Sequence, residues 1–240
     1  MKILAIETST MLGGVAVMGE TEGLITEVRL NVKSTHSERL MTEVDHVLKQ
    51  ACMSISEIDV FGIAIGPGSF TGLRIGLSTV KGLSYATGKP IVSVPSLEAL
   101  AWNFPYSAYP VCTMFDARKK EVYAAVFRWE DSGFKRVMAE TSVKPYDLLK
   151  SLDGPVIFAG EGAQLYRETI VEMAGENALF PRWHFMVPSP SNIASMGLTK
   201  ALEGVFSEPV GLVPLYIRKS EAEVKKDAQL DFRANHSQEK

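Results

Sequence analysis

Cysteine is scarce in this sequence. Of 240 residues only Cys52 and Cys112 are cysteines, they lie far apart, and neither belongs to a Cys-x-x-Cys pair. A disulfide framework, a zinc ribbon and a thioredoxin-like redox motif are therefore excluded. We expect two buried thiols in a reducing compartment, and we predict a cytoplasmic protein.

Long apolar runs and a surplus of positive charge are also missing. The apolar run at residues 3–6 meets Glu7 too early for a signal peptide, and no run of about 18 apolar residues could span a membrane. Lys and Arg number 25 against 28 Asp and Glu, so the formal net charge is -3. Phosphate contacts need a surplus of cations, which argues against a protein that binds nucleic acid alone by bulk charge.

The composition that remains is ordinary for a soluble globular chain, with 46% hydrophobic and 22% charged residues. Apolar periodicity and turn residues predict strands at 2–7, 15–18, 24–30, 60–65 and 91–94, with helices at 35–51, 73–87 and 96–102. A similar order returns as strands at 111–116, 121–129, 134–140 and 156–159, with helices at 146–152, 163–174 and 192–205. We therefore predict two similar α/β domains, residues 1–104 and 105–218, whose last helix could pack back on the first domain. Residues 212–217 are expected as a terminal strand or extended segment, and residues 219–240 as a charged, disordered tail.

Two ends of the predicted helices carry cap signals. Thr35 and Glu38 have the spacing of a capping box, and Gly88 followed by Pro90 is typical of a helix end.

A glycine-rich turn, Gly66 to Gly72, joins the fourth predicted strand to the next long helix. It is neither a Walker A loop nor a Gly-x-Gly-x-x-Gly motif. Gly68, Gly72 and Gly76 recur every four residues, although each glycine inside a helix costs about 1 kcal/mol against alanine. Something must therefore approach this backbone closely: a neighbouring element of the same domain, a partner helix or a phosphate group.

The first strand ends in Glu7, Thr8, Ser9 and Thr10. A carboxylate followed by hydroxyls could hold a metal ion or nucleotide phosphates, and it is equally typical of a polar turn. We keep these four residues as a candidate nucleotide site.

Histidines offer no metal pair. His36 is followed four residues later by Leu40, where a second ligand on the same helix face would stand, and His46, His184 and His236 are scattered. We expect no metal site and no catalytic residues. The charged segment from Asp116 to Glu121 is predicted as a hairpin turn that is either solvated or in contact with an anion or partner.

Several segments together resemble the bacterial TsaB (YeaZ) family over about residues 1–223. The resemblance rests on these stretches: ILAIETST at 3–10, THSERL at 35–40, GPGSFTGLRIG at 66–76, DARKKEVY at 116–123 and LYIR at 215–218.

The resemblance implies a fold of two actin/hexokinase/heat-shock-ATPase-like domains, each with a mixed five-stranded sheet. It implies a role in threonylcarbamoylation of adenosine 37 of tRNA (the t6A modification) as the non-catalytic partner that activates the transferase TsaD. TsaE is implied as a second partner, and tRNA is contacted only through the complex. No cofactor is implied, although a nucleotide could bind at a partner interface. TsaD-type proteins carry a two-histidine metal motif at this first helix, whereas this sequence has Leu40.

The family also implies that the first two long helices pack against those of TsaD or of a second copy, which predicts a homodimer. The expected surface comprises Leu40, Met41, Val44, Leu48, Gly72, Leu73, Gly76, Leu77 and Val80. The alternative function is an ATP-using or metallopeptidase-like enzyme of the same fold, with Glu7, Thr8 and Ser9 binding metal and phosphate.

Overall fold

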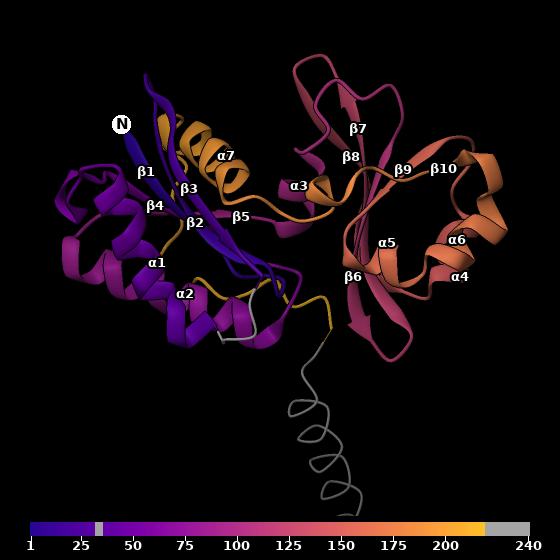
Figure 1. Cartoon of the computed structure of the whole chain (residues 1–240), viewed down its shortest axis with the longest axis horizontal. Coiled ribbons are helices and arrows are strands. Elements are labelled where there is room, and N and C mark those ends of the chain that lie inside the picture. Colours follow the sequence, from indigo (N-terminus) through magenta and orange to yellow (C-terminus); the bar gives the residue numbers. More distant parts are fainter. Residues whose placement is uncertain (32–35, 219–240) are drawn as a thin grey trace, which may run out of the picture.

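The computed structural model describes residues 1–31 and 36–218, which form two lobes side by side, each built on one β-sheet (Figure 1). The predicted capping box at Thr35 and the predicted tail at 219–240 lie outside the described residues. Within the described ranges, every helix is too short or too polar to span a bilayer.

The first sheet has five strands in the order β3-β2-β1-β4-β5. β1, β2 and β3 form the predicted antiparallel meander, while β4 and β5 run parallel to β1. The carboxyl ends of β1 and β4 therefore lie at one edge of the sheet, where the loops after them meet. The strands are β1 (Lys2–Glu7), β2 (Gly13–Gly19), β3 (Gly23–Leu30), β4 (Val60–Ala64) and β5 (Ile91–Val94).

Helices from both ends of the chain cover the two faces of this sheet (Figure 1). α1 (His36–Gln50) and α2 (Phe70–Thr87) pack on one face, where Leu4 and Ile6 lie. α7 (Pro190–Leu202) packs on the other face, where Ile3 and Ala5 lie. Successive side chains of a strand point to opposite faces, so the apolar run of β1 serves both layers.

Both ends of α2 follow from its sequence. At its start the Ser69 hydroxyl accepts a hydrogen bond from the Gly72 N–H at 3.2 Å. At its end Gly88 adopts a left-handed conformation with φ of 70°, and its N–H donates to the Ser84 carbonyl. The predicted closure of this helix by glycine is confirmed.

The second sheet has the order β10-β9-β6-β7-β8 and its own hydrophobic core. α3 packs against β6 and β7, and α5 against β6 and β9. The strands are β6 (Val111–Arg118), β7 (Glu121–Glu130), β8 (Gly133–Val143), β9 (Val156–Ala159) and β10 (Ala178–Leu179). The helices are α3 (Ser96–Ala101), α4 (Pro145–Lys150), α5 (Glu161–Leu165) and α6 (Arg167–Ala174), with short 3-10 turns at Ile55–Glu57, Gly175–Asn177 and Trp183–Phe185.

Two mixed five-stranded sheets flanked by helices confirm the predicted fold class. Three local features need comment. The helix expected at 163–174 is two helices, because Tyr166 between them has φ -107° and ψ 22°. Residues 212–217, expected as a strand or an extended segment, form no strand. The two-residue strand β10 was not predicted, because so short a segment carries no periodicity.

Candidate functional site

The end of β1 carries the candidate nucleotide residues, and the structure buries all of them. Glu7 and Thr8 are 0% exposed, Ser9 1% and Thr10 4%. β1 is the central strand of its sheet, and α2 and α7 cover its two faces. Glu7, Thr8 and Ser9 therefore form a sealed polar cluster, which we call the β1-end cluster.

Only one of the two carboxylate oxygens of Glu7 has a hydrogen-bond partner in this cluster. Its Oε1 accepts a hydrogen bond from the Ser9 N–H at 2.5 Å, while its Oε2 makes no hydrogen bond to any described residue. Burial raises the pKa of Glu7 to about 7, and the hydrogen bond from the Ser9 N–H offsets part of that rise. Near neutral pH this carboxyl is therefore poised between its neutral and ionised forms.

Thr8 and Ser9 lie against the two glycines that flank the start of α2. A Cβ at Gly76 would lie 2.3 Å from Thr8 Oγ1 and 3.1 Å from Ile63 Cδ1. A Cβ at Gly68 would lie 2.3 Å from the Ser9 carbonyl oxygen, which accepts the Ser69 N–H at 2.7 Å. At both positions the close approach expected from the glycine repeat is made by the residues that directly follow β1 in the same lobe.

The hydroxyls of the β1-end cluster lack partners as well. Neither Thr8 Oγ1 nor Ser9 Oγ makes a hydrogen bond within residues 1–31 and 36–218. Each buried polar atom left without a partner costs about 1–3 kcal/mol. The cluster is therefore a polar site that the described part of the chain does not fully satisfy.

The predicted partner surface on α1 and α2 requires a correction. Of its nine residues only Met41 is exposed, with 55% of its surface accessible. Periodicity identified the apolar face of each helix correctly, but that face seals the helix against the sheet. The residues that the structure buries in the core of the first lobe are Leu40, Val44, Leu48, Gly72, Leu73, Gly76, Leu77 and Val80.

A buried ion pair on α1 was not predicted from the sequence. Arg39 and Glu43 are 8% and 4% exposed, and Arg39 Nε lies 3.3 Å from Glu43 Oε1. Arg39 also donates to the carbonyls of Leu30 and Met11, at 3.1 and 3.4 Å. It thereby ties α1 to the turn after β1; the spacing of four residues was the available signal.

A cleft of about 1110 Å³ opens between the two lobes. Its walls come from the segment 67–74 at the start of α2, from the turn between β6 and β7, and from residues 215–218. Thr10 and Met11 also line it, whereas Glu7, Thr8 and Ser9 do not. The cleft therefore lies beside the β1-end cluster without reaching it.

Aromatic and cationic side chains meet on one wall of this cleft. The Phe70 and Tyr216 rings lie 5.4 Å apart, and they are 40% and 37% exposed. The Arg74 guanidinium lies 3.9 Å from the centre of the Phe70 ring, and its Nε donates to the Tyr216 hydroxyl at 3.0 Å. These three side chains form a platform of flat groups, which we call the Phe70 platform.

The turn between β6 and β7 faces the Phe70 platform across the cleft. Arg118, Lys119 and Lys120 are exposed and have φ of 61°, 53° and 63°. Asp116 supports this turn, because its carboxylate accepts the Arg118 N–H at 2.8 Å and lies 3.0 Å from the Arg118 guanidinium. The predicted hairpin is confirmed, and its tip presents three consecutive cations in a left-handed conformation that is unfavourable for such residues.

Residues 212–218, which we call the C-terminal strap, run from the first lobe to the second. The Leu215 N–H donates to the Ile65 carbonyl at 2.7 Å. At the other end Arg218 lies 3.1 Å from Glu121, whose carboxylate also accepts the Ser142 hydroxyl at 2.8 Å. The two strap contacts, Leu215 with Ile65 and Arg218 with Glu121, join residues far apart in the sequence, so no local pattern could have indicated them.

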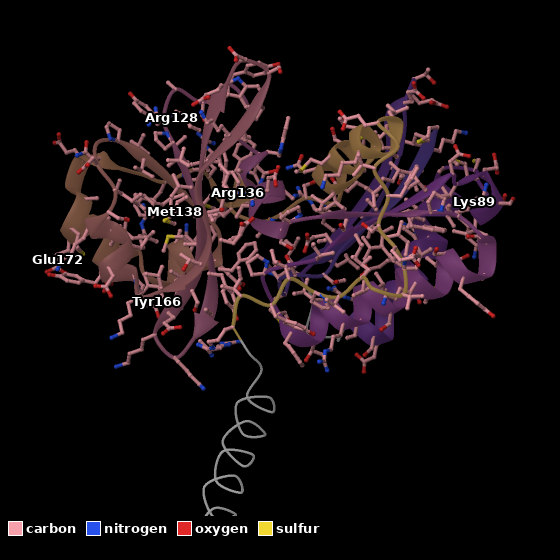
Figure 2. All side chains as sticks on the ribbon, turned by 180° about the vertical axis from the view of Figure 1, so that it is seen from behind. Lys89, Arg128, Arg136, Met138, Tyr166 and Glu172 are labelled. Atoms are coloured by element: carbon pink, nitrogen blue, oxygen red, sulfur yellow. The ribbon has the colours of Figure 1, made fainter. Side chains whose placement is uncertain are left out.

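A further ion pair lies within the second lobe, between β8 and α3, which packs on β6 and β7. Arg136 of β8 lies 3.0 Å from Glu98 of α3 and 3.0 Å from Glu140, and Figure 2 shows it near the junction of the lobes. The strap contacts at Leu215 and Arg218 therefore add to the connecting chain in setting the relative placement of the lobes.

Metal ligands are not grouped in the part of the chain that the structure describes. Within it no three side chains of His, Cys, Asp or Glu could hold a metal ion together. Leu40, at the position where the second histidine would stand, is 2% exposed and packs in the core.

Comparison with known proteins identifies one family. The family model described as "TsaD: tRNA N6-adenosine threonylcarbamoyltransferase" matches residues 26–226. Two relatives are named tRNA threonylcarbamoyladenosine biosynthesis protein TsaB. The Bacillus subtilis protein is 34% identical over 94% of this chain and 97% of its own length, and the Escherichia coli protein is 29% identical over 88% and 94%.

A solved structure described as "YeaZ from Pseudomonas aeruginosa" superimposes with a TM-score of 0.78 at 26% identity, covering 90% of this chain and 99% of that chain. Sequence, family model and fold thus agree over nearly the full described length. This chain belongs to the TsaB (YeaZ) family, within the wider family of TsaD-like domains.

Proposed function

We propose that this protein is a non-catalytic partner that binds and activates a TsaD transferase in threonylcarbamoylation of adenosine 37 of tRNA. The observation that carries the proposal is the 34% identity to a TsaB protein over 97% of that protein's length. Leu40 also supports the proposal, because it packs in the core at the position where TsaD-type proteins are expected to carry the second histidine of their metal motif.

The test is reconstitution of the modification with purified TsaD, TsaE, threonylcarbamoyl-adenylate and tRNA, with the modified nucleoside measured by mass spectrometry. We expect no product from this chain alone and a large fall in product when it is left out. Transfer by this chain alone would contradict the non-catalytic role, and full activity of TsaD without it would contradict the activating role.

We further propose that α1 and α2 bind TsaD, or a second copy of this chain, through their exposed faces. The two helices pack side by side, and Met41 of α1 and Tyr85 of α2 are 55% and 94% exposed. We expect Met41→Glu and Tyr85→Glu to weaken co-purification with TsaD and dimerisation measured by light scattering.

The matched control for these variants is Val137→Glu, which places a carboxylate at a residue of β8 that is 58% exposed. It lies in the second lobe and should leave both associations intact. Equal loss in all three variants, or no loss in any, would contradict docking through α1 and α2.

One observation favours a second candidate function. The β1-end cluster contains three buried oxygens that make no hydrogen bond to described residues, and a Mg²⁺-nucleotide would satisfy such oxygens in an ATP-using enzyme. Calorimetry with ATP and Mg²⁺ separates the two functions. We expect no heat of binding at the β1-end cluster; tight binding that Glu7→Gln abolishes, together with ATP turnover, would favour the enzyme.

A further inference from the structure

The charge of the cleft is opposite to that of the chain. Four of its lining side chains are cationic, namely Arg74, Arg118, Lys119 and Arg218, and two are carboxylates, Asp116 and Glu161. The whole chain carries a net charge of -3. Positive charge is therefore concentrated where the surface is concave, and a concave wall of low dielectric strengthens its field.

Flat groups accompany these cations. The Phe70 platform exposes two aromatic rings beside a guanidinium, and Tyr123 lines the opposite wall. Aromatic rings and arginine planes stack on nucleobases, while the neighbouring cations neutralise phosphates. The combination fits a ligand that carries both bases and phosphates.

The placement of the cations favours a continuous strand over a single nucleotide. Arg118 lines the cleft and has 85% of its side chain exposed, so this wall of the cleft is open to solvent. The start of α2 has no Walker-type loop to surround a triphosphate. Exposed cations at the rim and stacking groups inside suit an RNA backbone that passes through an open groove.

We propose that the cleft between the lobes binds an unpaired stretch of RNA, with bases on the Phe70 platform and phosphates on Arg118 and Lys119. The inference rests on the proposed function, because tRNA is the RNA that this protein would meet there. It extends that function by giving this chain a contact with tRNA of its own, in place of contact through its partners only.

The experiment measures binding of the purified full chain to fluorescent RNA by anisotropy, between about 50 and 200 mM salt. The probes are a hairpin RNA with an unpaired loop, a blunt RNA duplex of equal length, and ATP as a competitor. We expect the hairpin to bind more tightly than the duplex, and ATP to compete only weakly.

Two variants test the two halves of the site. Arg118→Ala with Lys119→Ala should flatten the dependence of log K on log salt by about 1.4, because each single-strand phosphate contact contributes about 0.7. Phe70→Ala should weaken binding about tenfold at unchanged salt dependence, and Phe70→Trp should restore it, because stacking is largely independent of charge. Thermal melting checks that each variant is folded.

The matched control is the double variant Lys89→Ala with Arg128→Ala. It removes the same number of charges from Lys89, at the outer end of the first lobe, and Arg128, at the upper edge of the second lobe in Figure 2, and neither residue lines the cleft. Binding should stay as in the unaltered protein. Equal loss in the control would reduce the interaction to general charge attraction and overturn the cleft as its site.

Other results would also overturn the inference: no binding of any RNA, equal affinity for hairpin and duplex, or displacement of RNA by low concentrations of ATP. The last result would assign the cleft to a mononucleotide. Because RNA binding is measured without TsaD, its failure leaves the activating role intact. Failure of the reconstituted modification to depend on this chain would refute the activating role and leave RNA binding standing.

Discussion

Replacing Glu7 by glutamine should make the protein more stable at high pH and change little at low pH. The pKa of Glu7 is about 7 in the folded chain against an ordinary value of 4.5. Below pH 4.5 the carboxyl is protonated in both the folded and the unfolded state, so it contributes no difference. Between pH 4.5 and 7 the unfolded chain releases this proton first, and the free energy of unfolding falls as pH rises.

The magnitude follows from the size of the shift. A rise from 4.5 to about 7 corresponds to about 3 kcal/mol of lost stability once the pH exceeds both values. Glutamine keeps the acceptor for the Ser9 N–H and cannot ionise. We therefore expect Glu7→Gln to gain about 3 kcal/mol relative to the unaltered protein at pH 8 and less than about 1 kcal/mol at pH 5. In a chain of this length that gain raises Tm by about 6–12 °C.

The assay is urea unfolding of both proteins at pH 5, 6, 7 and 8, followed by fluorescence and circular dichroism. Any cost of the added amide N–H group is the same at every pH, so the change in the difference between the proteins isolates Glu7. A difference that stays constant from pH 5 to pH 8, or that falls with rising pH, would refute a buried carboxyl with a raised pKa.

Two further comparisons test the packing of α1 and α2 by matched variants. Gly76→Ala should lower stability by about 1–3 kcal/mol, because its Cβ would meet Thr8. Gly82→Ala in the same helix has open space around the added Cβ and should raise stability by up to about 1 kcal/mol. In thermal melts the two changes in Tm must therefore have opposite signs. Val44→Glu should abolish soluble folding, because it places an unpaired charge in the core. Met41→Glu, at an exposed position, should change stability by less than about 0.5 kcal/mol. A soluble, folded Val44→Glu protein would contradict the core position of Val44.

Local pattern predicted most of the fold. Alternation and glycine turns predicted the β1–β3 meander, and the helix end at Gly88 was readable from three residues. Two other features could not be predicted from local pattern. Tyr166 ends a helix through its backbone conformation although tyrosine is no helix breaker, and β10 is only two residues long.

The candidate site was predictable only where it depends on neighbours in sequence. The pattern at Glu7 to Thr10 indicated a polar cluster, but its burial depends on α2 and on α7, which begins at residue 190. Likewise a helical stripe such as Leu40, Val44 and Leu48 shows that one face is apolar, not which surface covers it. The cleft escaped prediction because its walls come from segments as distant as Arg74 and Tyr216.

The buried carboxylate and hydroxyls of the β1-end cluster and the cations and aromatic rings of the cleft lie in separate places, whereas a nucleotide-using enzyme would combine them in one site. Contacts at Gly68 and Gly76 close the cluster, and in both a residue directly after β1 meets the backbone at or near the start of α2. At Gly68 the nearest atom is the Ser9 carbonyl oxygen, which no side-chain rotation can move, whereas at Gly76 it is the Thr8 hydroxyl. Exposing Glu7 would require the end of β1 and α2 to separate and their shared core to open. The strap contact between Arg218 and Glu121 is half-exposed, and a pair of that kind contributes at most about 1 kcal/mol. Opening the cluster would therefore disrupt the core of the first lobe, whereas the cleft is bordered by a strap contact that is partly exposed to solvent.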